Sequence, residues 1–507
     1  MAGGVTKVLN SWAVFTPTEK KNITVYILGI MLYKFGLEAF NGSIIALATN
    51  RYDFGGSLNT LERIGLLTGL NQAFQCVGSI LIAPLIRRYP TKVVLSSAIF
   101  LFGLCTAILL IVDAATGGKI VPKGWHKANG KDDFTYYGDY NTDAIIPIYC
   151  VAGIVYGMVE LIRRIVPRDI VGGNVQKLRR MDALVHIFYE VAGTSGAFCT
   201  ALALIPRLGN NYSFIITPIF FTAAAAMWMF LDVEFTQEPV SNSLEGKPSY
   251  FKSVFSGAVL FFDSVYTGGK ILFSSRKFIW LLPGYSIALY AHRYLENGVA
   301  PQIAKRYLGH SAWAQIMVGG SNFGELLGAL FVFLFTNFIK TPIPWLRLDA
   351  LMLMVDAWMV AATFLPVSFG WAAGDVSLAA YIQAALARME GSSRNVSSLG
   401  AVMAFLYSVY IVLYAITSPL LGRYLDGVYT RSGGKNGGDI REGLKMTAGV
   451  QFTIIAGLIL MATFVPKGAF ALNPDKLFEE NLDDEVAEGK DIDEDQKEEK
   501  MVPVVCG

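Results

Sequence analysis

Charged side chains are scarce in this chain of 507 residues, of which only 16% are Asp, Glu, Lys or Arg. An average soluble domain carries about 25%. Hydrophobic residues make up 53% of the chain and fall in long blocks, so a lipid bilayer is the expected solvent. The formal net charge is only +2, and the basic residues flank apolar blocks instead of forming a water-facing cluster. We therefore expect no nucleic-acid partner.

Cysteine and histidine are also rare, with five and four residues respectively. No two cysteines have the C-x-x-C spacing of a zinc or redox site, and four of the five lie in apolar blocks, which argues against a disulfide framework. The chain lacks the G-x-x-x-x-G-K-[ST] loop that cradles nucleotide phosphates. It also lacks H-x-x-x-x-D and G-x-S-x-G arrangements typical of membrane transferases and hydrolases. We expect neither an enzyme nor a cofactor.

What the chain does have is apolar length. A helix needs about 20 residues to cross the hydrocarbon core, and only helices satisfy every backbone polar group within one segment. Twelve stretches meet this requirement, at 23–49, 62–86, 93–113, 145–166, 182–205, 212–233, 278–299, 311–337, 346–366, 370–387, 398–421 and 445–465. The predicted fold class is an all-α membrane protein, with twelve transmembrane helices in two pseudo-symmetric six-helix bundles.

This pattern divides the chain into five parts. They are a cytoplasmic N-terminus (1–22), an N-terminal six-helix bundle (23–233), a central cytoplasmic loop (234–277) with an amphipathic run after Tyr250, a C-terminal six-helix bundle (278–465) and an acidic disordered cytoplasmic tail (466–507). Residues 475–500 of the tail hold 13 acidic side chains against 4 lysines, which is typical of disorder. An excess of Lys and Arg in the loops on the N-terminal side predicts that both termini are cytoplasmic. Basic residues in loop 422–444 weaken that excess. The polar loop 114–144 is expected to be a solvated connector, with a binding lid as the alternative.

The two halves resemble each other. Lys34 and Glu38 in the first stretch match His292 and Glu296 in the seventh, since each pair places a base four residues before a glutamate and is followed by Asn-Gly. The second and eighth stretches match as well. Two matches in the same order predict an internal repeat. The matched residues of the second and eighth stretches are Gln72, Gln75 and Gly78 against Asn322, Glu325 and Gly328.

Six plus six helices, a long central loop and a short loop between helices two and three resemble the major facilitator superfamily over the whole chain. The family's glycine-rich second-loop motif is matched in part by APLIRRYPTK at 83–92, where Leu85, Arg88 and Lys92 fit. The residue in place of the motif's aspartate is Arg87, which removes one partner of the family's cytoplasmic ion pair. The resemblance implies a divergent branch with Arg88 and Lys92 as gating residues. The tail and loop lengths favour a eukaryotic source, such as a fungus.

The same resemblance implies that helices one, four, seven and ten line a central cavity. Ionisable side chains at bilayer depth are costly, so they normally have a partner or a function. Pairs one turn apart, such as Lys34 with Glu38, can instead neutralise each other within a helix. The substrate-binding candidates on these helices are Lys34, Glu38, Asn41, Glu160, Arg163, His292, Arg293, Glu296, Tyr381 and Gln383.

Four further residues are candidates for proton coupling. Asp182, His186 and Glu190 follow at four-residue steps in the fifth helix and therefore share one face. Three roles remain open for them: ion pairing with the arginines of the fourth helix, a proton relay through the imidazole, or nitrogen and oxygen ligands for a divalent cation. Glu325 in the eighth helix has no base one turn away, which also suits a coupling role.

Together these features predict a secondary active transporter that moves a small polar solute, zwitterionic or charged, by alternating access with protons as the coupling ion. A divalent-metal or organic-cation exporter of the same fold is the alternative. The expected partners are a small-molecule substrate and the lipid bilayer, and we expect a monomer with no metal cofactor. The plasma membrane is favoured over an organelle membrane.

Overall fold

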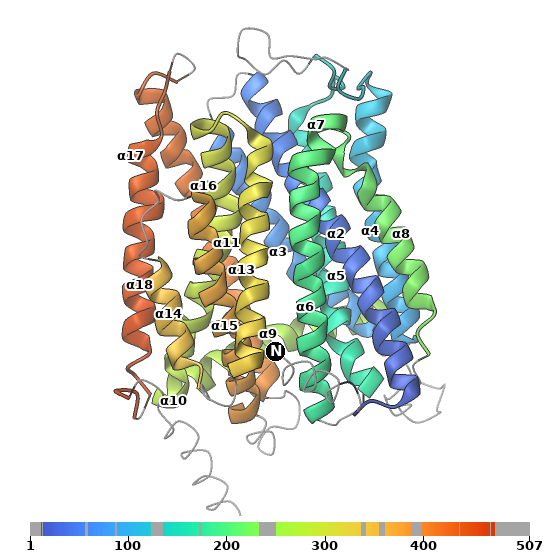
Figure 1. Cartoon of the computed structure of the whole chain (residues 1–507), viewed down its shortest axis with the longest axis vertical. Helices are drawn as coiled ribbons and strands as arrows, with labels where there is room; N and C mark the ends of the chain where they lie inside the picture. The colour runs from blue at the N-terminus through green and yellow to red at the C-terminus, as the bar shows by residue number, and fades with distance from the viewer. Residues whose placement is uncertain are drawn as a thin grey trace, which may run out of the picture.

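Helices are the only regular elements in the part of the chain that the computed structural model describes (Figure 1). The described residues are 12, 14–55, 59–86, 89–122, 135–171, 175–232, 250–335, 341–353, 360–386, 398–434, 437–466 and 468–471. Seven of the described helices are long and apolar enough to cross a membrane. The protein is an integral membrane protein, and its predicted fold class is confirmed.

The N-terminal half forms the blue and green side of Figure 1. Its helices are α2 (Pro17–Phe54), α3 (Thr60–Ile86), α4 (Thr91–Ala115), α5 (Ile145–Val171), α6 (Val175–Cys199) with its continuation through η3 (Thr200–Leu204) and α7 (Ile205–Leu208), and α8 (Ile216–Met229).

The C-terminal half forms the yellow, orange and red side. After α10 (Arg276–Ile279), its first spanning helix alternates α-helical and π-helical segments: η5 (Leu282–Ile287), α11 (Ala288–Tyr294), η6 (Leu295–Val299), α12 (Ala300–Gln302) and η7 (Ile303–Tyr307). The remaining helices are α13 (Ala314–Phe335), α14 (Ile343–Leu353), α15 (Val360–Leu386), α16 (Ser398–Arg431), and α17 (Arg441–Leu444) continued by η12 (Lys445–Val450) and α18 (Gln451–Ala462).

Each half has its own apolar core. One large cluster of buried side chains contains only residues between 15 and 231, and the other contains only residues between 272 and 469. The apolar core is therefore divided between the two halves, which contact each other through α3 with α16 and through α6 with α13.

The predicted repeat is visible in the packing of two glycines. A Cβ added at Gly78 of α3 would lie 1.8 Å from the carbonyl oxygen of Ile154 in α5, and one added at Gly328 of α13 would lie 2.4 Å from that of Phe369 in α15. Gly78 therefore brings α3 against the backbone of α5, and Gly328 brings α13 against the backbone of α15. In each half the partner is the second helix further along the chain, and small residues permit such a close approach. The sequence match between these stretches corresponds to equivalent packing.

Several helix boundaries differ from the sequence prediction; for example, α16 extends to Arg431, ten residues into the predicted loop 422–444. Two of the differences have a clear physical cause. The first helix begins at Pro17 instead of residue 23, because Thr16 and Glu19 form a capping box in which each side chain accepts a hydrogen bond from the other's backbone N–H. The break predicted after Pro366 is also wrong, since α15 continues through that proline. In a membrane bundle, neighbouring helices can satisfy the carbonyl that a proline leaves without a donor.

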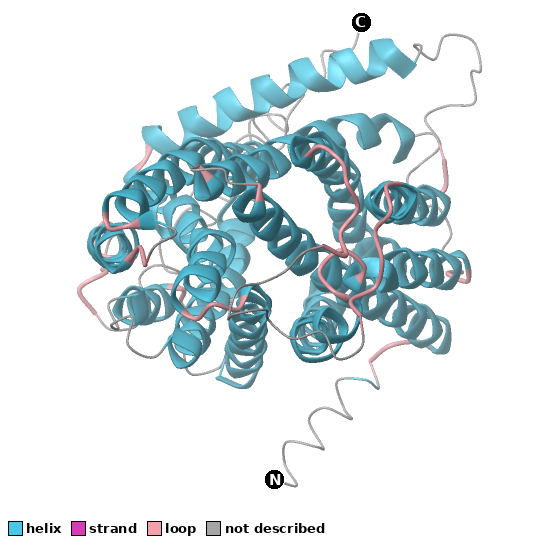
Figure 2. Ribbon diagram, turned by 90° about the horizontal axis from the view of Figure 1, so that it is seen from above, coloured by secondary structure: helices cyan, strands magenta, loops and turns pink. Residues whose placement is uncertain are grey.

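The central segment is more than a loop. Its amphipathic run forms α9 (Tyr250–Ser274), a helix that lies across the bundle at one edge of the ring of spanning helices (Figure 2). Residues 233–249 lie outside the described residues, as does the acidic tail except for 466 and 468–471.

Candidate functional site

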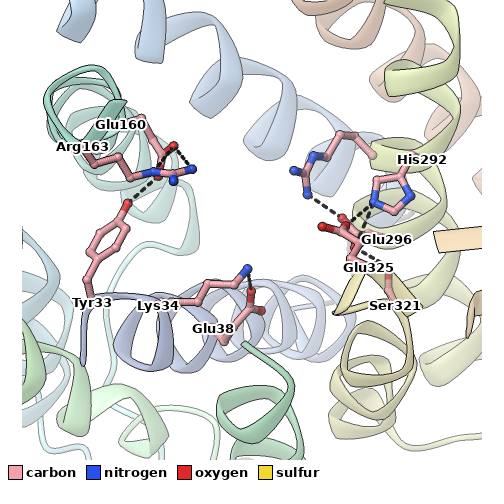
Figure 3. A network of polar contacts seen from close by, with 10 residues as sticks. Tyr33, Lys34, Glu38, Glu160, Arg163, His292, Glu296, Ser321 and Glu325 are labelled. Atoms are coloured by element: carbon pink, nitrogen blue, oxygen red, sulfur yellow. Dashed lines mark hydrogen bonds and ion pairs between the residues drawn. The ribbon is translucent and has the colours of Figure 1, made fainter. Parts of the chain in front are cut away.

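Polar side chains from both halves meet in the middle of the bundle (Figure 3). On the N-terminal side, Lys34 Nζ donates to Glu38 Oε1 at 2.5 Å, one turn along α2, and both side chains are only 9% exposed. The ammonium group also lies 4.5 Å from the centre of the Tyr189 ring of α6. This approach depends on Gly193, because a Cβ there would lie 2.5 Å from Lys34 Cε.

The C-terminal side carries a denser cluster. His292 Nε2 lies 2.7 Å from Glu325 Oε1 of α13 and 3.5 Å from Glu296 Oε1 on its own helix. Glu296 also accepts hydrogen bonds from Arg293 at 2.8 Å and from the Ser321 hydroxyl at 2.6 Å. One imidazole thus stands between two buried carboxylates. The π-helical segment η6, which begins at Leu295, contains Glu296, and such segments are frequent at functional sites.

His292 can donate only one hydrogen from Nε2, and its Nδ1 has no hydrogen-bond partner among the described residues. The ring stacks on Trp371 with its centre 5.5 Å from the indole. In the neutral tautomer that donates to Glu325, Nδ1 is the acceptor nitrogen. A proton added at Nδ1 would therefore create an imidazolium between two carboxylates without breaking an existing hydrogen bond.

A third group lies on α5. Glu160 accepts hydrogen bonds from Arg163 Nε at 2.7 Å and from the Tyr33 hydroxyl at 3.0 Å. The Arg163 guanidinium lies 4.7 Å from the Tyr189 ring, so this ring contacts cations from both α2 and α5. The arrangement holds a paired carboxylate and guanidinium beside an aromatic face.

The three proton-coupling candidates on α6 divide between the site and the surface. His186 and Glu190 each place a ligand atom within 4.8 Å of Glu325, whereas Asp182 is exposed. Glu190 is 1% exposed, and its Oε2 has no hydrogen-bond partner among the described residues. Among the residues that the structure describes, two groups could hold a metal ion, and both include Glu325: one adds His186 and Glu190, and the other adds His292 and Glu296.

The other predicted site residues lie outside this cluster. The Asn41 side chain accepts a hydrogen bond from the Tyr149 hydroxyl at 3.1 Å. Tyr381 is 2% exposed and packs on the Trp280 ring, with centres 5.6 Å apart. Lys92, a predicted gating residue, donates to the Leu231 carbonyl at 2.8 Å within the N-terminal half. Arg88 and the side chain of Gln383 lie outside the described residues.

Sequence reasoning missed a charged contact between the halves at the end of the bundle where α2 stops and α3 starts, here called the upper end. Arg306 donates to both carboxylate oxygens of Asp53, at 2.7 and 3.0 Å, and Lys305 lies 3.8 Å from the same carboxylate. Lys305 also donates to Asn50 at 3.0 Å. These contacts close the upper end between α2 and η7. The adjacent bases in K-R-Y were the available signal, but their partner lies about 250 positions earlier.

No protein-family model matches this chain, and no curated protein matches it. Solved structures share its fold. The nucleoside transporter NupG aligns with a TM-score of 0.51 and 12% identity over 88% of this chain and 99% of NupG. The xylose transporter XylE from E. coli, in a partially occluded inward-open conformation, gives 0.53 and 9% over 89% and 97%. The peptide transporter POT in complex with sulfate gives 0.55 and 11% over 90% and 95%. The chain therefore shares the helical fold of these three transporters.

Proposed function

We propose that this protein is a secondary active transporter that carries a small polar solute by alternating access and is driven by protons. The observation that carries the proposal is the placement of His292 between Glu296 and Glu325, deep in the bundle and with Nδ1 available to accept a proton. Imidazole is the side chain that changes charge near neutral pH. A proton there alters the electrostatics of the site where groups from both halves meet.

Three further observations support the proposal. The similar structures are transporters of a nucleoside, of xylose and of peptides. Separate cores in the two halves suit a rocking motion about a central site. The closed upper end, held by Arg306 and Asp53, is one of the states that alternating access requires.

The first experiment identifies the solute. The purified chain should be screened by thermal shift against nucleosides, D-xylose, dipeptides, amino acids, organic acids and organic cations. Uptake of the stabilising compound is then measured in proteoliposomes with and without an imposed pH gradient. We expect the gradient to stimulate uptake severalfold in the unaltered protein.

The coupling role is tested with His292→Gln and Glu325→Gln, and with Glu442→Gln on the exposed start of α17 as the matched control. We expect both site variants to retain exchange of solute across the membrane while losing stimulation by the gradient, because exchange needs no net proton movement. The control should behave like the unaltered protein. Full gradient stimulation in both site variants would refute proton coupling through this pair.

A divalent-cation transporter is the second candidate, and the unpaired Glu190 oxygen beside His186 and Glu325 is the observation that favours it. Imidazole and carboxylate ligands suit zinc, manganese or iron(II). Stabilisation by Zn²⁺ or Mn²⁺ that is lost in His186→Ala would support this candidate, whereas an unchanged melting temperature with either ion would eliminate it.

We also propose the plasma membrane as the location. A fluorescently tagged full-length chain should label the cell boundary, and labelling of an internal membrane would contradict this assignment.

A further inference from the structure

Helix α9 connects the two halves from outside the ring of spanning helices. At its start, the Tyr250 hydroxyl donates to the Leu81 carbonyl of α3 at 3.0 Å. Toward its end, Gly268 lies against α16, where an added Cβ would be 2.0 Å from the Ala401 carbonyl oxygen. The helix runs across the spanning helices instead of along them (Figure 2).

One face of α9 is a continuous apolar stripe that the protein leaves uncovered. Its members follow one another at steps of three, four or seven residues, which places them on the same side of a helix. A row of aromatic side chains facing water would be strongly unfavourable. The stripe, here called the aromatic face, consists of Phe251 (83% exposed), Phe255 (73%), Val259 (54%), Phe262 (70%), Tyr266 (74%) and Phe273 (57%).

The charged residues of α9 lie on a different side. Lys252, Asp263 and Lys270 are exposed and follow at steps of eleven and seven, so they form a second row roughly 60° around the helix axis from the aromatic face. The third side, which includes Gly268 and Leu272, is buried against the protein. A helix with one protein-facing side, one apolar side and one charged side fits the boundary between acyl chains and headgroups.

The neighbouring surface shows which apolar medium covers the aromatic face. The Phe273 ring packs on Phe405 of α16, with ring centres 5.9 Å apart. Val412, Ile416 and Leu420 follow Phe405 by seven, eleven and fifteen residues, lie on its side of α16 and are 56–59% exposed. That stripe belongs to a spanning helix and faces lipid. The aromatic face of α9 therefore continues a lipid-facing surface.

We infer that α9 is a membrane-interface helix that binds phospholipid: its aromatic face lies among the acyl chains of one leaflet and its charged row lies at the headgroups. Lys252 and Lys270 are placed to meet lipid phosphates. Because α9 contacts α3 in one half and α16 in the other, it ties both halves to the same leaflet. This inference is independent of which solute or coupling ion the protein uses.

Neighbouring residues on the two rows provide matched probes. Phe255→Cys and Phe262→Cys report on the aromatic face, and Ser256→Cys and Asp263→Cys report on the adjacent polar side. Each is introduced into the full-length chain after the native cysteines are replaced by serine or alanine, labelled with a nitroxide and reconstituted in phosphatidylcholine–phosphatidylglycerol vesicles. Collision rates with oxygen and with a water-soluble nickel chelate are then measured by electron paramagnetic resonance.

We expect the ratio of oxygen to nickel collision rates to be several-fold higher at 255 and 262 than at 256 and 263. Variants are compared only if their melting temperatures match that of the cysteine-free protein. Equal ratios at the paired positions would overturn the inference. High nickel collision rates at 255 and 262 in the reconstituted protein would also overturn the inference. The aromatic face would then be exposed to water, as expected of a surface that binds a protein partner.

Discussion

Removing the carboxylate of Asp53 should open the upper end of the bundle. In the closed structure this carboxylate accepts two hydrogen bonds from Arg306 and one from the Thr60 hydroxyl at 2.9 Å, and it also lies 3.8 Å from Lys305. The paired side chains of Arg306 and Asp53 are only 10% and 15% exposed. In Asp53→Ala, two cations remain close together in the closed state, whereas water can hydrate them once the halves separate.

The size of the effect follows from that burial. Leaving one member of a buried ion pair without its partner costs about 3–5 kcal/mol. The small remaining exposure and the ring of Tyr429, 4.1 Å from the Arg306 guanidinium, reduce the penalty, so we take the lower bound. About 3 kcal/mol corresponds to roughly a hundredfold decrease in the ratio of closed to open molecules.

Spin labels at Ile120 and Glu442 measure this ratio, since both are exposed and lie at the upper end on opposite halves. Double electron–electron resonance in nanodiscs should give one short distance for the cysteine-free parent and a dominant longer distance for Asp53→Ala. Combining Asp53→Asn with Arg306→Met should restore the short distance, because Lys305 is then the one remaining cation of the cluster and keeps its hydrogen bond to Asn50. An unchanged distribution in the single variant, or a double variant as open as the single one, would refute this reasoning.

Three other perturbations test the interior. Gly78→Ala places a Cβ against a backbone oxygen of α5 and should lower the free energy of unfolding, followed by thermal melting, by about 1–3 kcal/mol. Gly457→Ala is the control and should melt like the parent, because the added Cβ would have no atom from another part of the chain within 4 Å. Equal losses of stability in the two variants would contradict the packing argument. Lys34→Met should lower the free energy of unfolding by about 3–5 kcal/mol because Glu38 is left buried without its partner, and adding Glu38→Gln should recover most of that loss. No recovery in the double variant would contradict the view that Lys34 and Glu38 chiefly neutralise each other. Asp113→Ala removes the acceptor of hydrogen bonds from the Gly138 backbone N–H and the Asn211 side chain. Amide hydrogen exchange in residues 135–144 should therefore become about tenfold faster or more. Unchanged exchange rates would show that other contacts hold this loop.

Local features were predictable from the sequence. The spacing of Lys34 and Glu38 already indicated a pair one turn apart, and apolar length located the seven described helices that are long and apolar enough to cross a membrane. The error at Pro366 has a physical cause. Proline ends helices in water because it removes a donor and clashes with the preceding turn, but in a bundle the neighbouring helices offset that loss.

Contacts between distant segments were beyond the sequence. Glu325 lacks a base one turn away, as the sequence shows, yet its partner His292 comes from another helix 33 residues earlier. Arg306 and Asp53 are 253 residues apart and meet only because the two halves close at the upper end. Helical periodicity assigns a residue to a face but does not say which helix that face contacts, so the site could be predicted as a set of residues and not as a geometry.

The repeat itself explains why coupling is assigned to the C-terminal half. Each half buries a base four residues before a glutamate at the matching position, Lys34 with Glu38 and His292 with Glu296. Lysine beside a carboxylate keeps its charge across the physiological range, whereas imidazole does not. Under the proposed function, the lysine position supplies a fixed charge and the matching histidine position supplies the switchable one. In the proposed mechanism, the C-terminal half responds to the coupling proton at His292, and the Lys34–Glu38 pair of the N-terminal half provides a fixed electrostatic reference.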